Sequence, residues 1–246
     1  MSVKKAKVIT VTSVKGGTGK STFTLNLAGS FSKQKIKTII LDLDLSSGVI
    51  GPTLNIKSNN DIYTLTDDMA NGRFETLDKY VKQYNEYIDI IPSSTDPRNS
   101  LKVFPEYIDN LIRQLEYKYE IILIDTNHVT SNINLSLLDI SDIVLYIISD
   151  DLMDLKNMKS MISIYEDMNS NKYKIILNKS LRKTIGNYEI KTILGKDIDY
   201  TIPSTFYEKN IQKYIYDSKI ISLNKKDKTE KIFDVIATDL ANIRKQ

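Results

Sequence analysis

The sequence predicts a three-layer α/β domain built on a mostly parallel β-sheet. Two observations indicate this fold: short, continuous apolar runs recur along the chain, and stretches with the apolar spacing of a helix separate them. Strands covered on both faces read as continuous apolar runs, and parallel strands need crossover connections, usually helices. We find no Pro/Gly/Ser-rich linker, low-complexity stretch or internal repeat, so we expect a single domain over residues 1–246.

The elements follow one another in regular alternation. A helical pattern from Phe23 to Phe31 follows the first run, and three longer ones cover Phe104–Tyr119, Leu152–Met168 and Lys228–Ile243. The Leu152–Met168 pattern places Met and Ile on one face. The expected strands are Lys7–Ser13, Lys37–Leu43, Tyr87–Pro92, Glu120–Asp125, Asp142–Ser149, Lys172–Asn178 and Ile198–Pro203.

Composition excludes several classes of site. Hydrophobic residues make up 41% and charged residues 26%, as in an ordinary globular protein, and the net charge is only +3. The chain has no cysteine and one histidine, which excludes disulfides, thiolate or multi-histidine metal sites and a cysteine nucleophile. We see no signal-peptide core and no run of about 18 apolar residues, so we expect a cytoplasmic protein.

A glycine-rich segment, Val14–Thr22 (VKGGTGKST), follows the first expected strand and begins the first expected helix. Glycines allow positive φ and bring backbone N–H groups onto phosphate oxygens, and a helix N-terminus adds free N–H groups and its positive dipole end. The position fits a P-loop, although Val14 stands where the general pattern has its first glycine. The alternative is a strand-to-helix turn without a ligand.

This loop predicts binding of ATP or ADP with Mg²⁺. We expect Lys20 to reach the β- and γ-phosphates, the Ser21 hydroxyl to ligate Mg²⁺, and Thr22 to lie at the α-phosphate. The residues expected to contact the nucleotide here are Gly16, Gly17, Thr18, Gly19, Lys20, Ser21 and Thr22.

Carboxylates stand at the ends of two expected strands. Asp42 and Asp44 end the second run, where a period of two puts both on the same face. Asp125 ends the apolar run Ile121–Ile124, an arrangement typical of a residue that holds Mg²⁺. Carboxyl ends of parallel strands share one edge with the phosphate loop. Ordinary capping or turn formation is the alternative for each.

The segment Lys15–Thr22 resembles the deviant Walker A signature of the MinD/ParA superfamily, which also contains the nitrogenase iron protein and arsenical-pump ATPases. The resemblance implies a homodimer that closes over two ATP molecules. Lys15 would then act on the partner's nucleotide, Asp44 would position the attacking water, and Asp42 would help Asp125 and Ser21 with the Mg²⁺ shell. A solvated loop lysine is the alternative for Lys15.

The resemblance extends to the base pocket, where it places Asn178 and the backbone around Pro203 against adenine. An ordinary strand cap is the alternative for Asn178. The segment after Asp125 departs from the family pattern of a small residue and prolines, since it reads Thr126-Asn127-His128. We expect His128, the only histidine, to orient a loop or to sit partly exposed rather than to sense the γ-phosphate.

Several later segments resemble the CpaE/TadZ branch, which localises machinery for Flp/Tad-type pili. They are Asp42–Leu54, Leu138–Asp142, Asp151–Lys159 and Tyr200–Ser204. This branch usually carries an N-terminal receiver-like domain, and the present sequence has none. The main expectation is a slowly hydrolysing ATPase that positions a pilus or surface assembly, with an unidentified cargo or activating protein as partner.

Two other members of the superfamily remain as alternatives. Scattered lysines allow nonspecific DNA binding by a dimer, as in partition ParA proteins. A basic amphipathic stretch, Ile232–Ile243, allows peripheral membrane contact, as in MinD-like placement regulators. We favour packing of this last helix on the sheet over membrane contact.

Overall fold

A computed structural model describes residues 5–129, 131–179, 185–208, 211–224 and 231–243. Its centre is an eight-stranded sheet with the strand order β3-β4-β2-β5-β1-β6-β7-β8. All neighbouring strands run parallel except β3, which is antiparallel to β4. The strands are β1 (Lys7–Thr12), β2 (Thr38–Leu43), β3 (Lys82–Gln83), β4 (Ile88–Ile91), β5 (Ile121–Thr126), β6 (Ile143–Ile148), β7 (Tyr173–Asn178) and β8 (Tyr200–Ile202).

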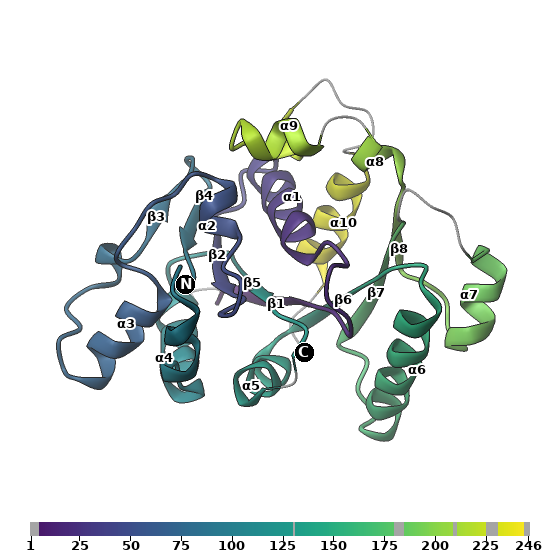
Figure 1. Cartoon of the computed structure of the whole chain (residues 1–246), viewed down its shortest axis with the longest axis horizontal. Coiled ribbons are helices and arrows are strands. Elements are labelled where there is room, and N and C mark those ends of the chain that lie inside the picture. The colour runs from purple at the N-terminus through teal and green to yellow at the C-terminus, as the bar shows by residue number, and fades with distance from the viewer. Residues whose placement is uncertain (1–4, 130, 180–184, 209–210, 225–230, 244–246) are drawn as a thin grey trace.

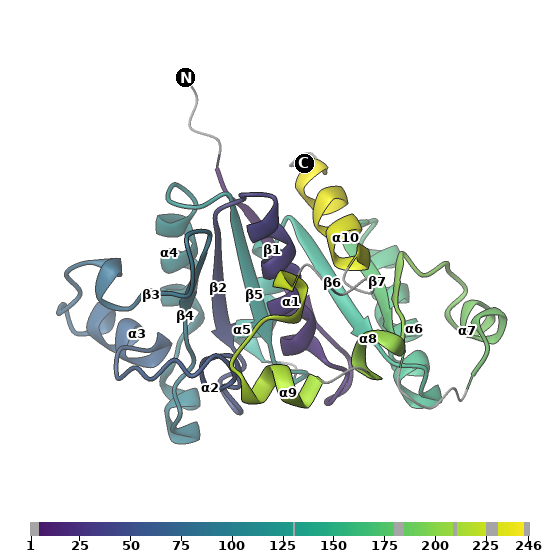
Figure 2. The same ribbon diagram turned by 90° about the horizontal axis from the view of Figure 1, so that it is seen from above.

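Helices cover both faces of this sheet, which makes three layers (Figure 1). The two faces hold separate sets, and the view from above in Figure 2 shows α1 lying along the middle of the sheet. One face carries α1 (Lys20–Lys33), α2 (Ile50–Thr53), α8 (Thr205–Glu208), α9 (Ile211–Tyr216) and α10 (Lys231–Asn242). The other carries α3 (Ile62–Ala70), α4 (Pro105–Leu115), α5 (Asn132–Ile140), α6 (Leu152–Asp167) and α7 (Asn187–Leu194). The structure confirms the predicted fold class.

Alternate side chains of each strand enter different cores. In β1, Ile9 and Val11 pack with α1 and α10, whereas Val8 packs with α3 and α4. A third cluster joins β6 and β7 to α6 and α7. All six residues of β1, β2, β5 and β6 are buried, which explains why these strands read as continuous apolar runs.

The last helix packs on α1, as the sequence analysis favoured. Its Phe233, Ile236 and Leu240 are fully buried, although Val235 of the same expected stripe is 52% exposed. The Lys7 ammonium donates to the carbonyl oxygens of Leu240 and Ala241 and so caps the C-terminal end of α10. None of the helices in the described residues is long and apolar enough to span a membrane.

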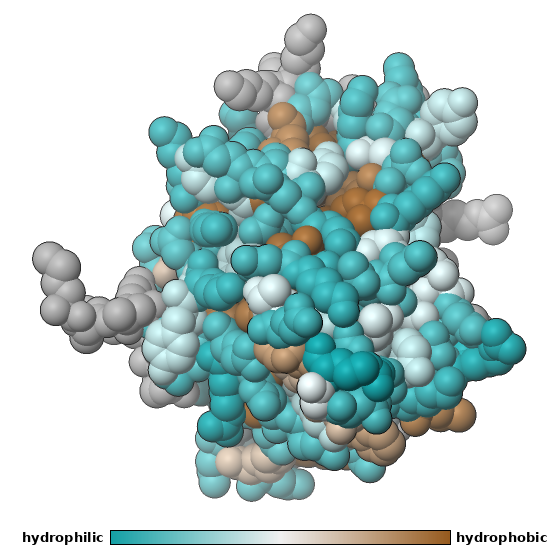
Figure 3. Space-filling view, turned by 90° about the vertical axis from the view of Figure 1, so that its left-hand side faces the viewer, coloured by the Kyte–Doolittle hydropathy of each residue, from teal (hydrophilic) through white to brown (hydrophobic). Residues whose placement is uncertain are grey.

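The structure corrects some expected elements. The antiparallel strand β3 and the helices α2, α3, α5, α7, α8 and α9 were not predicted from the sequence. In the segment Leu152–Met168, the face that packs on the sheet holds Met158, Met161 and Ile162, as expected, whereas Met153, Ile164 and Met168 are exposed. The start of the expected Lys228–Ile243 helix lies outside the described residues. The side formed by α3 and β3 is mostly hydrophilic (Figure 3).

Candidate functional site

The glycine-rich loop connects β1 to α1 at the carboxyl edge of the sheet. Gly17 and Gly19 have φ of 77° and 89°, left-handed values that favour glycine at both positions. Gly19 is the N-cap of α1 and supplies no side-chain cap, and the first turn of α1 holds no acidic residue. The N–H groups at this helix end are therefore free of a side-chain cap, and an anion is their natural ligand.

Lys20 lies under this loop rather than in solvent. Its side chain is buried, and its ammonium donates to the Ser13 hydroxyl over 2.9 Å. Ser13 in turn donates to the Lys15 carbonyl over 2.6 Å, which links the lysine to the loop backbone. Burial lowers the pKa of Lys20, opposed by the charges of Asp125 and Asp44. A phosphate would supply the counter-charge that this buried ammonium needs.

Ser21 and Asp125 lie together, as the predicted metal site requires. The Ser21 hydroxyl donates to Asp125 over 2.6 Å, and the Thr24 hydroxyl donates to its second oxygen over 3.0 Å. Asp125 is fully buried in β5, and burial raises the pKa of its carboxyl to about 6. Two hydroxyls of α1 therefore hold a buried carboxylate in β5, and the charge of Lys20 offsets its burial only in part.

Asp42 is the neighbour of Asp125 across β2 and β5, because the two residues stand opposite each other in the parallel register. It is fully buried and accepts from the backbone N–H groups of Asp44 and Ile50. Burial raises the pKa of Asp42 well above its ordinary value, and the charge of Asp125 raises it further. Two adjacent buried carboxyls favour a cation at this edge.

The donor set fits Mg²⁺ bound with a nucleotide. Within the described part of the chain, no group of three or more His, Cys, Asp or Glu side chains could hold a metal alone. Mg²⁺ prefers one or two carboxylates, a hydroxyl or water, and phosphate oxygens. Ser21, Asp125 and Asp42 match the protein's share of such a site.

Asp44 lies just beyond β2 and closes a turn. One of its carboxyl oxygens is 3.3 Å from the N–H of Ser46 and 3.2 Å from that of Ser47, and its carbonyl accepts from Gly48. In this state Asp44 therefore makes the turn contacts weighed as the alternative. The geometry does not test the expected role in positioning water.

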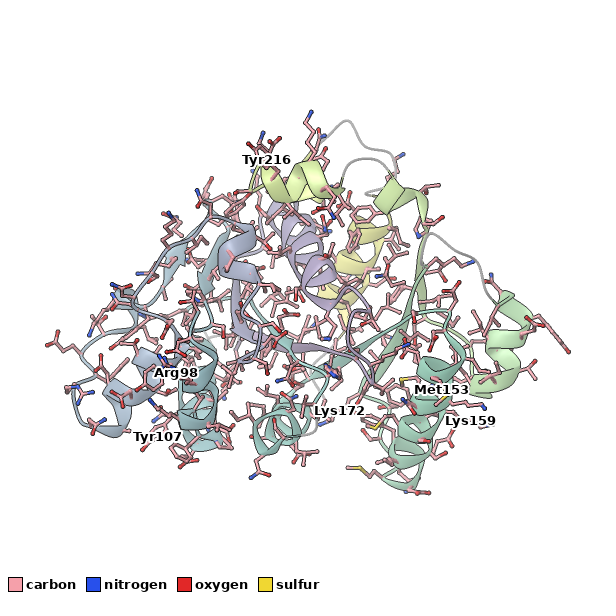
Figure 4. All side chains as sticks on the ribbon, in the orientation of Figure 1. Arg98, Tyr107, Met153, Lys159, Lys172 and Tyr216 are labelled. Atoms are coloured by element: carbon pink, nitrogen blue, oxygen red, sulfur yellow. The ribbon has the colours of Figure 1, made fainter. Side chains whose placement is uncertain are left out.

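Lys15 extends from the loop toward α6 of its own chain. Its ammonium pairs with the Asp151 carboxyl at 2.9 Å, and both side chains are about half exposed. The contact raises the pKa of Lys15 and lowers that of Asp151. Asp151 is the N-cap of α6, and the next two residues, Leu152 and Met153, are exposed apolar side chains (Figure 4). An exposed ion pair is weak, so Lys15 can leave it at little cost.

The predicted base pocket lies beside the phosphate loop. Asn178 ends β7 and its amide donates to the Thr18 carbonyl over 2.7 Å. The Asn178 carboxamide oxygen (Oδ1) and the Thr18 hydroxyl are buried, and neither has a hydrogen-bond partner among the described residues. Pro203 directly follows β8, which pairs with β7. Orphaned polar atoms of this kind are rare in a folded interior, and a polar ligand or water would pair with them.

His128 and its neighbours lie beside the glycine loop. A Cβ added at Gly16 would lie 3.1 Å from Cε1 of His128, so the exposed imidazole ring rests on the phosphate loop. The Asn127 carboxamide oxygen holds this turn by accepting from Val129 N and from the Asn134 amide.

Ser13, Thr24 and Asp151 were also missed. No motif singled out Ser13 or Thr24. Asp151 entered the sequence analysis only within a segment that resembles the CpaE/TadZ branch, and neither that resemblance nor its helix N-cap signal indicates the contact with Lys15.

Comparison with solved structures supports the fold independently. A ParA family ATPase from Chlorobium tepidum superposes with a TM-score of 0.83 at 22% identity, covering 96% of this chain and 99% of that one. The septum site-determining protein MinD from Pyrococcus horikoshii, complexed with Mg-ADP, gives 0.81 at 20% identity and 96% coverage of both chains. At this identity the likeness shows a shared fold.

Sequence comparison identifies the family. The tyrosine-protein kinase CpsD of Streptococcus agalactiae is 29% identical over 124 residues, 50% of this chain and 53% of the kinase, so the chain spans about half the length of this curated relative. The model of the AAA domain family AAA_31 matches residues 6–183, well over half of the chain and all of the site from the phosphate loop to Asn178. The chain belongs to the AAA domain family AAA_31.

Proposed function

We propose that this protein is an ATPase that binds ATP with Mg²⁺, hydrolyses it slowly and uses the ATP state to form a homodimer. One observation carries the proposal: a buried lysine and a hydroxyl–carboxylate pair, Lys20 and Ser21–Asp125, meet under an uncapped glycine loop. Burial still lowers the pKa of Lys20 and raises that of Asp125, although each charge lies near the other. A nucleotide with its metal would satisfy all of them together.

The chain's own residues divide the chemistry among them. Lys20 and the N–H groups of the loop hold the phosphates and offset charge on the oxygens of the breaking bond. Ser21 and Asp125, supported by Asp42, hold Mg²⁺, which would neutralise phosphate charge when bound. Asp44 accepts a hydrogen bond from the attacking water once its turn opens. Asn178 and the backbone at Pro203 receive adenine.

The dimer part of the proposal is supported by the surface around Lys15. Lys15 pairs only weakly with Asp151, and the exposed apolar residues Leu152, Met153 and Val129 surround the same edge of the sheet. Exposed apolar side chains beside an active site are a common feature of an interaction face. On ATP binding a second copy would cover this face, and Lys15 would move from Asp151 to the partner's nucleotide.

The cellular role is narrower and rests on the resemblance of short segments. We propose positioning of a pilus or surface assembly of the CpaE/TadZ kind, with a cargo protein that accelerates hydrolysis. Because solved structures of a ParA family ATPase and of MinD share the fold, two alternative functions remain: DNA partition and placement at the membrane. The kinase relative adds a third outcome, transfer of the γ-phosphate to tyrosine.

The experiment is light scattering of Asp44→Ala with ATP, with ADP, and with ATP plus nonspecific duplex DNA. We expect a dimer with ATP alone, because loss of the water-positioning carboxylate stops hydrolysis and traps the ATP state. Lys15→Ala is the matched variant, expected to bind ATP without forming the stable dimer or hydrolysing it.

A monomer in ATP for Asp44→Ala, with normal turnover, would remove both the dimer switch and the role of Asp44. DNA-bound mass would favour partition over pilus positioning. Radiolabelled ATP that leaves label on the protein rather than as free phosphate would replace hydrolysis by phosphotransfer.

A further inference from the structure

A second cavity lies away from the nucleotide site, between the β3–β4 turn and the segment 213–224. Its volume is about 460 Å³, within the range of small-molecule pockets. The residues that line it are Tyr84, Lys213, Tyr214, Asp217, Lys219, Ile220, Leu223 and Asn224. Figure 1 shows α9, which supplies Lys213 and Tyr214, beside α1 on the face opposite α6.

The lining combines an apolar part with a cationic rim. Ile220 is buried and Leu223 is half-buried, and the phenol rings of Tyr84 and Tyr214 are also half-buried. The two lysines, both exposed, face a single carboxylate, so the rim has an excess of one positive charge. Lys219 pairs with Asp217 only at 3.6 Å, and the Lys213 ammonium has no ion pair within the described ranges. Such a rim attracts an anion.

Hydrogen bonds connect the apolar part of this cavity to α1, the helix that begins at the phosphate loop. Ser222, between Ile220 and Leu223, donates from its N–H to the Asn26 side chain and from its hydroxyl to the Asn26 carbonyl, over 2.9 and 2.7 Å. Asn26 also donates to the Thr22 carbonyl over 2.8 Å, one turn from the phosphate loop.

Close contact makes the connection rigid. A Cβ at Gly29 would lie 2.1 Å from the Ser222 hydroxyl and 2.7 Å from Cγ2 of Ile220, so only glycine permits this approach of α1. Ten residues separate Gly29 from Gly19, which is about 15 Å along the helix. The cavity and the phosphate loop are therefore two ends of one packed unit.

We propose that this cavity binds a small organic anion, a compound with a phosphate or carboxylate group and an aromatic or aliphatic body. The anionic group lies at Lys213 and Lys219, and the body lies on Ile220, Leu223 and the two tyrosines. Occupancy fixes the segment 213–224 on α1 and changes nucleotide affinity through Ser222 and Asn26. This second effect rests on the proposed function, whereas binding of the anion does not.

The test uses the full chain with Lys20→Ala, which blocks the phosphate loop, and titrates phenyl phosphate, phenylacetate, benzyl alcohol and inorganic phosphate by calorimetry. We expect saturable binding of at least one aromatic anion to the parent and to Lys20→Ala alike, and weaker binding of benzyl alcohol and inorganic phosphate. Lys213→Ala/Lys219→Ala should weaken binding of that anion about tenfold. The matched control is Lys156→Ala/Lys159→Ala, two exposed lysines of α6. Figure 4 shows Lys159 on the face opposite α9.

The outcomes separate the possibilities. Preference for phenyl phosphate or for phenylacetate assigns the anionic group. Binding lost in Lys20→Ala but kept in the Lys213/Lys219 variant would overturn the proposal, because the probe would then occupy the phosphate loop. Absence of saturable binding to the parent protein, or an equal loss in the α6 control, would overturn it as well.

A separate experiment tests whether anion binding in the cavity changes the affinity for ATP. The bound anion should shift the ATP affinity of the parent protein by a factor that Ser222→Ala reduces, with thermal unfolding to show that the variant is folded. Anion binding with no shift in ATP affinity would remove the coupling and keep the site. If the parent protein fails to bind ATP at all, the proposed function fails while the anion titration still decides the cavity.

Discussion

Two aspartate sites of this protein differ in the groups that stabilise their charges. At the nucleotide edge, Asp42 and Asp125 are fully buried side by side, and within the described part of the chain they receive hydrogen bonds only from hydroxyl and backbone N–H groups. In α3, Asp68 receives the Arg73 guanidinium at 3.0 Å, the Lys79 ammonium at 2.8 Å and the Tyr80 hydroxyl at 2.5 Å. The pKa of Asp125 is raised to about 6 by burial, whereas the contact with Lys79, together with Tyr80 and Arg73, lowers that of Asp68 far below its ordinary value.

The difference separates structural from functional use of the same side chain. Asp68 has its cations within the fold, so its charge stabilises the folded state. Among the described residues no lysine or arginine forms an ion pair with Asp42 or Asp125, and the nearby charge of Lys20 offsets the burial of Asp125 only in part, so their charges cost stability until a further cation arrives. A carboxylate left in this condition at the end of a buried strand marks a binding site.

The largest effect is expected for Lys20→Ala, which removes the cation next to this carboxylate edge. ATP binding should weaken by at least about a hundredfold, because charge-assisted bonds to two phosphates are lost. Equilibrium binding of a fluorescent ATP analogue measures this, with Lys159→Ala as the exposed-lysine control. ATP affinity equal to that of the parent protein would show that the glycine loop is not a phosphate site.

Asp68→Asn should have the opposite profile, with reduced stability and unchanged ATP binding. Arg73 and Lys79 would lose their shared counter-charge, so the urea midpoint should fall at pH 7. The lowered pKa means that the Asp68 contribution is present above the unfolded value near 4 and disappears as pH falls below it. The deficit of the variant should therefore shrink in acid, and a deficit that stays constant to pH 3 would contradict the charge explanation.

Asp125→Asn should stabilise the protein in the absence of metal and nucleotide. A carboxyl with a pKa raised from 3.8 to about 6 costs about 3 kcal/mol above pH 7. The variant loses part of this stabilisation, because the Asn side chain has one acceptor oxygen and cannot accept from both Ser21 and Thr24. We therefore expect a net increase of about 1–2 kcal/mol in the free energy of unfolding.

The sign of the pH effect follows from the raised pKa. The parent protein, in EDTA, should lose stability as pH rises from about 4 through about 6 and stay level above. Asp125→Asn should reduce this loss of stability with pH. Substitution of the exposed carboxyl of α6 in Asp167→Asn should leave the loss unchanged. Urea unfolding from pH 5 to 8 measures it. If Asp125→Asn is less stable than the parent protein at pH 8, its carboxylate is structural and the contrast with Asp68 fails.

Tyr80→Phe should give the smallest effect. The ring is fully buried and its packing is kept, so the loss is one hydrogen bond to Asp68, about 1 kcal/mol in the free energy of unfolding. Asp68 keeps Arg73 and Lys79, so the decrease should be smaller than for Asp68→Asn. An equal decrease would show that the tyrosine hydroxyl, and not the two cations, dominates this cluster.

Much of the fold followed from the sequence because its parallel strands are buried on both faces. Runs such as the one ending at Asp125 are continuous and short, which favours a buried strand over a helix. The strand β3 escaped prediction because it has two residues and no pattern. In α6, exposed Met153 and Met168 are as apolar as buried Met158, so composition alone could not assign the face.

The candidate site divides in the same way. The sequence determined the phosphate loop by itself, because Gly17, Gly19 and Lys20 act within one local segment whose backbone geometry glycine dictates. It also determined that Asp42 and Asp125 end strands. Only the tertiary structure decided that these two carboxyls are neighbours and that Lys15 pairs with Asp151. It also decided that Ser222 connects the cavity beside α9 to α1. These contacts join segments far apart in the chain, and strand order and helix packing, which no local pattern encodes, bring them together.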